Sequence, residues 1–213
     1  KTFTMQTMAL RMRRKGIQVF IIAPLKGHEF YRAARNVGGE FIQISPASKN
    51  CINIMEIRKV DNSVNELLDG PTLDASALAG KIQRLHIFFS LLIPDMSHEE
   101  KQLLDEALIK TYARKGITHK NESLTDPQHP EQYKKMPILE DVYNVLLESE
   151  DTKRLAHILN RLVHGSASSF NQQTNVDLTN KYTVLDISEL TGSSDLLTVG
   201  MFVALDYVWD KAK

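Results

Sequence analysis

The sequence predicts an α/β fold in which a parallel sheet carries an all-helical insertion. Near both ends of the chain, helical periodicity alternates with short apolar segments, which is the pattern of βαβ units in a parallel sheet. Between about residues 60 and 164, every periodic segment instead has the 3.6-residue spacing of a helix. We therefore expect an incomplete α/β core from residues 1–59 and 165–213, and an all-helical subdomain from residues 60–164.

The first 45 residues contain the helix, strand, helix, strand order of the predicted core. Methionines recur at helical spacing between Met5 and Met12, and this helix is expected to end in a basic turn before Gly16. The four cations of that turn favour an ordinary helix end over a nucleic-acid surface, because cations stabilise the negative pole of a helix. Residues 18–24 are apolar on both faces, as in a strand covered by helices on both sides. A second helix and a strand over residues 40–45 follow.

The predicted insertion consists of helices with recognisable starts. A turn over residues 69–72 is expected to begin a long helix, and Ser97 with Glu100 has the spacing of a capping box for the next one. Three prolines and intervening polar residues predict a loop over residues 116–136. Pro137 suits the first position of a further helix, and one more helix completes the insertion.

The α/β pattern then returns. Residues 165–169 are small and polar and predict a flexible connection, and residues 174–178 predict a polar loop. Residues 182–187 form an apolar strand that contains Asp186 near its end. A last helix is expected to run through Trp209.

Composition excludes several classes of protein. Because 26 basic residues balance 26 acidic ones, no overall charge draws the chain to nucleic acid or to an anionic membrane. The single cysteine, Cys51, excludes an internal disulfide, fits a reducing compartment and is most simply a small apolar residue. The most apolar run, residues 87–93, is much shorter than the roughly 20 residues that span a bilayer. The seven histidines lack metal-ligand spacing, so a protein-ligated zinc site is not expected.

The first helix opens with Lys1-Thr2 and leads into a buried strand, which is the arrangement that follows a phosphate-binding loop. In such a loop the Lys contacts the β- and γ-phosphates and the Thr hydroxyl ligates magnesium. The glycines that would cradle the phosphates would precede Lys1. The alternative is an exposed helix that begins with Lys-Thr for no functional reason.

Two acids are further candidates for the same site, because ligands bind beyond the carboxyl ends of parallel strands. Glu29 lies in the segment after the first strand and is a candidate catalytic residue that orients a water or a metal; an ordinary helix start is the alternative. Asp186 lies near a strand end and is a candidate metal ligand, with a structural loop carboxylate as the alternative.

Taken in order, these features resemble the conjugative-transfer ATPases of type IV secretion systems, in the HerA/FtsK superfamily. The resemblance spans nearly the whole chain. Its most specific pieces are Thr-Asn-Val-Asp-Leu at residues 174–178 and Asp-Ile-Ser-Glu-Leu at residues 186–190, followed by a helix. One departure is Ala23, where relatives resemble Asp, so that Glu29 is the only acid left in this loop.

The resemblance implies an α/β fold with a partial, parallel, RecA-like P-loop core and an all-helical insertion. It implies ATP and Mg²⁺ as cofactors, with Lys1 and Thr2 binding the nucleotide and Thr2 holding Mg²⁺. It further implies a homo-hexamer, other secretion-apparatus proteins and DNA as candidate partners, and a cytoplasmic location at the inner face of the cell membrane through those partners. It places the Walker B strand, with its Asp-Glu pair, after the last helix. The chain is thus expected to be a fragment that binds nucleotide poorly and hydrolyses none by itself, cut from a parent that couples ATP hydrolysis to transfer.

Two rival hypotheses stay open. In one, the helical insertion is a protein-interaction module on a degenerate α/β platform that never binds nucleotide. In the other, the parent is a DNA pump related to double-strand translocases. Glycines before Lys1 in the parent would favour an ATPase over the interaction module.

Overall fold

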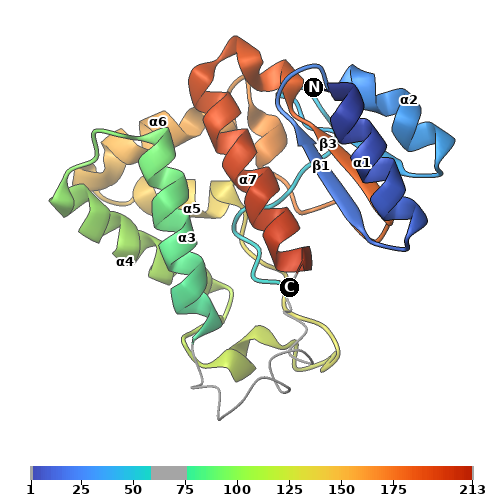
Figure 1. The fold of residues 1–213 in the computed structure, drawn as a ribbon. Coiled ribbons are helices and arrows are strands. Elements are labelled where there is room, and N and C mark those ends of the chain that lie inside the picture. The colour runs from blue at the N-terminus through green and yellow to red at the C-terminus, as the bar shows by residue number, and fades with distance from the viewer. Residues whose placement is uncertain (1, 59–75, 213) are drawn as a thin grey trace. The chain divides into compact units, whose positions relative to one another are not determined.

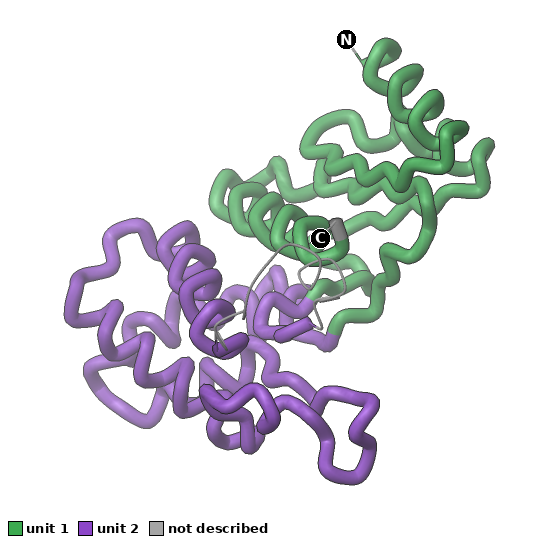
Figure 2. Tube along the Cα trace, turned by 60° about the horizontal axis from the view of Figure 1, so that its bottom comes forward, with its two compact units in different colours: residues 1–52, 174–212 green, residues 53–173, 213 purple. Residues whose placement is uncertain are grey.

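A computed structural model of the chain describes residues 2–58 and 76–212 (Figure 1). These residues form two compact units: unit 1 spans residues 1–52 and 174–212, and unit 2 spans residues 53–173 (Figure 2). No helix among the described residues has the length and apolar character needed to cross a bilayer.

The unit boundaries lie 7 to 9 residues from those that helical periodicity predicts, at positions 52/53 and 173/174. Side-chain amides explain the difference. The Nδ2 of Asn53 donates to the carbonyl of Pro137 at 2.9 Å and to Oε1 of Gln173 at 3.3 Å. The Nε2 of Gln173 in turn donates to the carbonyl of Met136 at 2.7 Å. Irregular segments at both ends of the insertion are therefore bonded into unit 2.

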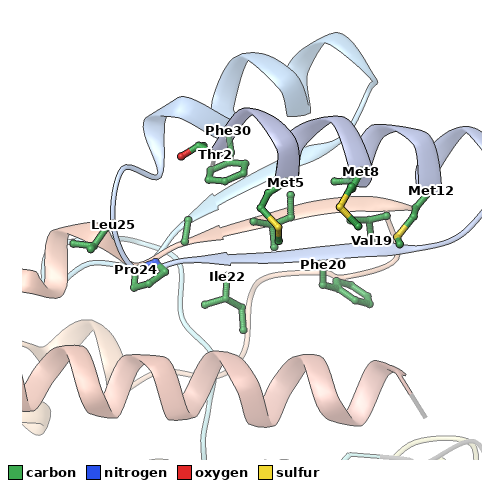
Figure 3. Close-up of a pocket in the computed structure, with 13 residues that line it drawn as sticks. Thr2, Met5, Met8, Met12, Val19, Phe20, Ile22, Pro24, Leu25 and Phe30 are labelled. Atoms are coloured by element: carbon green, nitrogen blue, oxygen red, sulfur yellow. The ribbon is translucent and has the colours of Figure 1, made fainter.

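Unit 1 is a parallel three-stranded sheet with helices on both faces. Its helices and strands are α1 Thr2–Arg14, β1 Val19–Ala23, α2 His28–Asn36, β2 Glu40–Gln43, β3 Tyr182–Asp186 and α7 Ser194–Ala212, with a 3-10 turn over Ser188–Gly192. The strand order is β1-β3-β2, so the last strand in sequence is the central one. Helices α1 and α2 cover one face and α7 covers the other (Figures 1 and 3). All five residues of β3 are buried, which agrees with the apolar strand that the sequence predicts there.

The polar loop over residues 174–178 connects the returning chain to the segment after β2. The Oδ1 of Asn175 accepts from the N–H of Cys51 at 2.7 Å, and its Nδ2 donates to the carbonyl of Lys49 at 2.6 Å. The N–H of Asn175 also donates to the carbonyl of Cys51 at 3.2 Å. Hydrogen bonds therefore join the segment that leaves unit 1, near Cys51, to the segment that returns to it, near Asn175.

Unit 2 is helical, as predicted. Its helices are α3 Ala77–Leu92, α4 His98–Arg114, α5 Leu139–Leu146 and α6 Lys153–Val163, with 3-10 turns over Asn121–Leu124, Glu150–Thr152 and Ser168–Phe170. The capping box before α4 is confirmed. Ser97 Oγ accepts from the N–H of Glu100 at 3.1 Å, and Oε2 of Glu100 accepts from the N–H of Ser97 at 2.9 Å. The helix start expected at residues 69–72 lies outside the described residues; α3 begins after Ser76, whose Oγ accepts from the N–H of Ala79.

Two details of unit 2 correct the sequence-based predictions. Pro137 is not the first residue of a helix, because the N–H of Ile138 is used to bind Asp141 Oδ2 at 2.8 Å and α5 begins only at Leu139. The segment 165–169 is not a flexible connection: it leads into a 3-10 turn, and Ala167 is fully buried. Small size here serves close packing rather than mobility.

The irregular segment that opens unit 2 is held by buried polar side chains. Tyr112 of α4 is fully buried and donates its hydroxyl to the carbonyl of Met55. Lys81 of α3 is also buried and donates Nζ to the carbonyl of Ile54 at 3.1 Å. These bonds satisfy backbone carbonyls that no strand or helix pairs.

Candidate functional site

The three strands end together at one edge of the sheet, as parallel strands must. Ala23 of β1 and Gln43 of β2 both stand in register with Asp186 of β3. The ladder continues just past this point, since the N–H of Ile187 donates to the carbonyl of Ala23 at 3.1 Å and that of Ile44 to the carbonyl of Asp186 at 2.8 Å. The carboxyl edge is therefore rigid where the candidate residues lie.

Asp186 is enclosed at this edge. Its side chain is buried, and Oδ1 accepts from the N–H of Ser188 at 3.0 Å. The backbone of Gly27 lies directly against the carboxylate: a Cβ built on Gly27 would lie 1.9 Å from Oδ1 and 2.4 Å from Oδ2 of Asp186. Only a residue without a side chain fits this contact, so the loop after β1 and the end of β3 are packed as one piece.

Glu29 lies in the first turn of α2, close to the same edge. Its carboxylate lies 3.7 Å from Nζ of Lys26 and its side chain is one-third exposed. Lys26 has a φ of 56°, a left-handed conformation that reverses the chain before α2. The backbone carbonyl of Glu29 accepts from Nε2 of Gln6 at 2.9 Å, which fixes the start of α2 to α1. The sequence places Glu29 near the site; the role of Gln6 as a tie between the two helices was not predicted.

Thr2 is the first residue of α1 and is half-buried, while Lys1 lies outside the described residues. Within the described part of the chain, the Thr2 hydroxyl makes no hydrogen bond. Figure 3 places Thr2 near Phe30, on the same side of the close-up as Leu25 and the end of β1. The start of α1 thus lies at the carboxyl edge, and its Thr2 hydroxyl has no hydrogen-bond partner among the described residues.

An apolar hollow of about 490 Å³ extends from Thr2 along β1 (Figure 3). Its floor is β1, an edge strand, and its roof is the face of α1 that carries Met5, Met8 and Met12. These methionines are 43 to 62% exposed. The methionine face of α1 is therefore apolar and partly exposed, and no element of unit 1 as described covers its exposed part.

Gln43 and Glu189 form a second polar contact at the edge that sequence reasoning missed. The Nε2 of Gln43 donates to Oε1 of Glu189 at 2.8 Å. Ser48 Oγ and Asn50 Nδ2 both donate to the carbonyl of Gln43, at 2.8 and 2.9 Å. The available signal was a polar residue, Gln43, within the strand predicted over residues 40–45.

The described residues contain no group of three or more His, Cys, Asp or Glu side chains that could hold a metal ion. A magnesium ion at this edge would therefore depend on phosphate oxygens, water and one hydroxyl rather than on a carboxylate cage, which is a usual arrangement for magnesium with a nucleotide. The Thr2 hydroxyl, which has no hydrogen-bond partner among the described residues, fits this role. Asp186 is buried and its Oδ1 accepts from the N–H of Ser188, and its role as a metal ligand stays a prediction.

The sheet, the helix that starts at its carboxyl edge and the helical insertion define a class of protein: a partial P-loop α/β core that carries a helical insert. No protein-family model matches the chain, and no curated protein sequence matches it. Among solved structures, VirB4 of Thermoanaerobacter pseudethanolicus matches with a TM-score of 0.80 and 25% sequence identity, over 99% of this chain and 74% of that chain. This likeness supports a VirB4-like fragment of a conjugative ATPase. It bears out the resemblance that the sequence shows and the fold class that the sequence predicts.

Proposed function

We propose that the chain is the nucleotide-handling part of a motor ATPase that couples ATP hydrolysis to type IV secretion and conjugative DNA transfer. The observation that carries the proposal is the position of α1, which begins at Thr2 beside the carboxyl edge of a parallel sheet in a VirB4-like fold. A helix start offers free N–H groups and a positive pole, and both favour a phosphate group at this point.

The roles follow from the positions. Lys1 would neutralise the β- and γ-phosphates, and the Thr2 hydroxyl would hold Mg²⁺. Bound ATP with Mg²⁺ supplies a phosphoryl group for transfer to water. Glu29 would orient that water, because it is the acid in the first turn of α2, directly after the loop that leaves β1. Its carboxylate lies 3.7 Å from Lys26 Nζ and its side chain is one-third exposed. The tie from Gln6 keeps Glu29 and Thr2 on helices that are fixed to each other.

Asp186 has contacts that favour a supporting task over the metal-ligand role that the sequence suggests, which stays a prediction. Its carboxylate bonds Ser188 and packs on Gly27. Asp186 would therefore fix the position of the loop from Pro24 to Gly27 relative to the end of β3. The start of α2, which follows this loop, would be fixed with it.

The wider assembly is also a proposal. A VirB4-like chain fits a homo-hexamer that contacts other secretion-apparatus proteins and DNA at the inner face of the membrane. The 213 residues contain no G-x-x-x-x-G-K-[ST] loop. We therefore propose that this chain alone binds nucleotide weakly and does not hydrolyse it.

Steady-state ATP hydrolysis by the full-length protein tests the proposal. Thr2→Ala should lower kcat by roughly 10- to 100-fold, in line with the loss of a group that supports a metal ion, and raising the magnesium concentration should recover part of the rate. Thr4→Ala is the matched control, because Thr4 lies on the same helix and is exposed. Equal rates for Thr2→Ala and the unmodified protein would contradict the role of Thr2. A magnesium-dependent rate in residues 1–213 alone that Lys1→Ala abolishes would contradict the proposal that this chain alone is inactive. The interaction-module hypothesis predicts instead that neither the long protein nor its variants hydrolyse ATP.

A further inference from the structure

The positive charge of this neutral chain is concentrated in its first 39 residues. That segment carries eight Lys and Arg residues and a single acid, Glu29, whereas the remaining residues carry 18 basic and 25 acidic ones. Among the described residues, Arg11, Arg13 and Arg14 take part in no ion pair. The balanced total therefore hides a strongly basic segment in unit 1.

Three of these cations line one groove. The groove has a volume of about 580 Å³ and is lined by Thr7, Leu10, Arg11, Arg13 and Arg14 of α1 and by Val37, which follows α2. The Nε of Arg13 is shielded from solvent and has no hydrogen-bond partner within the described residues. Within the described residues, three guanidinium groups without an ion-pair partner thus line one groove.

Helix polarity does not account for this many cations. The last turn of α1 holds Arg11, Arg13 and Arg14. The negative pole of a helix is equivalent to only about half an elementary charge, which one cation more than offsets. The sequence alone favours a plain helix end here; the groove and the unpaired Nε are what the structure adds. Helix polarity therefore leaves most of this positive charge unexplained.

We propose that this arginine groove, formed by Arg11, Arg13 and Arg14 between α1 and Val37, binds the phosphate backbone of nucleic acid without reading its sequence. A guanidinium fork matches the oxygens of a phosphate, and backbone contacts position a nucleic acid without specifying bases. The groove is a different site from the nucleotide edge, because at a rise of about 1.5 Å per residue its arginines lie roughly 14–18 Å along α1 from Thr2.

An anionic membrane is the competing partner and the geometry disfavours it. A helix that lies on a membrane needs apolar side chains beside its cations. The exposed methionines of α1 line the hollow next to β1, whereas Thr7, Leu10 and the arginines line the groove on the other side of the helix. The exposed methionines and the arginines of α1 thus lie on different sides of the helix.

Fluorescence anisotropy of a labelled DNA duplex of about 20 base pairs tests the proposal on residues 1–213, with salt varied between about 50 and 200 mM. The triple variant Arg11→Gln, Arg13→Gln, Arg14→Gln should bind at least tenfold more weakly, and the slope of log K against log salt should fall in magnitude by roughly 2 to 3, because about three phosphate contacts are lost. The corresponding Arg→Lys triple variant should keep the slope and lose only a few-fold in affinity, which separates a loss of contacts from a loss of folding.

The matched control removes the same net charge elsewhere, at three exposed lysines of unit 2: Lys101→Gln, Lys120→Gln and Lys135→Gln. It should bind within about twofold of the unmodified chain. Equal weakening by the control and the groove variant would overturn the proposal in favour of a net-charge effect, and so would an absence of DNA binding at the lowest salt. Groove-dependent sedimentation with phosphatidylserine vesicles, without DNA binding, would assign the groove to a membrane surface instead.

Discussion

The contact between Gly27 and Asp186 yields the sharpest prediction. Gly27 has a φ of −53° and a ψ of −36°, which any residue can adopt, so Gly27→Ala introduces no backbone strain of its own. The added methyl carbon, however, would lie 1.9 Å from Oδ1 and 2.0 Å from Cγ of Asp186. The whole effect of the substitution is therefore steric, and it falls on one buried carboxylate.

The cost can be worked from what must move. Asp186 is 4% exposed and cannot swing into solvent without breaking its bond to the N–H of Ser188. Overpacking of a well-packed site costs about 1–3 kcal/mol, and a buried donor left unpaired costs about 1–3 kcal/mol more. The free energy of unfolding of unit 1 should fall by roughly 2–6 kcal/mol. For a chain of this length, that lowers the unfolding midpoint by roughly 4–24 °C.

Hydrogen exchange at the β3 amides, followed through a urea titration, isolates unit 1 from unit 2. Gly192→Ala is the matched control in the same unit, because an added Cβ there meets nothing within 4 Å; it should change stability by less than about 0.5 kcal/mol. The double variant Gly27→Ala, Asp186→Ala should recover at least about 1 kcal/mol relative to the sum of the single effects. Unchanged stability in Gly27→Ala, or strict additivity in the double variant, would refute the reasoning.

Three further predictions concern single contacts. Tyr112→Phe should leave the carbonyl of Met55 unpaired and lower the stability of unit 2 by about 1–3 kcal/mol in urea denaturation, and an unchanged midpoint would count against this bond. Ser97→Ala should remove the capping box and cost about 1 kcal/mol, seen as faster hydrogen exchange in the first turn of α4 rather than throughout the unit. Burial, and then the nearby charge of Asp177, raise the pKa of Glu40 above its ordinary 4.5, so ionised Glu40 destabilises unit 1 at neutral pH. Glu40→Gln should therefore stabilise unit 1 by a few tenths of a kcal/mol at pH 7, and the gain should vanish as the pH falls through the raised pKa to below 4.5; a gain that grows on acidification would contradict the sign.

Local patterns in the sequence predict local structure well here. The methionine spacing predicts α1, and the apolar segments at residues 18–24 and 182–187 predict β1 and β3. The spacing of Ser97 and Glu100 predicts the start of α4. Each of these signals acts over one or two helical turns or along one strand. Pro137 shows the limit, because a proline that suits the first helical position also suits the extended residue two positions earlier.

The contacts that build the site join residues that are far apart in the sequence. Gly27 meets Asp186, and Gln43 meets Glu189, across the whole insertion. Periodicity in a single sequence does not show which distant segment of backbone packs against a given carboxylate. Strand order cannot be predicted for the same reason: the sequence indicates that β3 is buried, but not that it lies between β1 and β2.

The strand order has a consequence for the chain as it is synthesised. β1 and β2 are not neighbours; each pairs only with β3, which ends at Asp186, 143 residues after the end of β2 at Gln43. At a synthesis rate of about 5–20 residues per second, the two apolar strands wait roughly 7–30 s on the ribosome for a partner. Unit 2 is completed within that interval. If unit 2 folds first, it brings the two ends of the inserted segment close together. The hydrogen bonds between Cys51 and Asn175 can then hold β3 near β1 and β2. The loop that must close is thereby short, which lowers the entropic cost of pairing β3 with the other two strands.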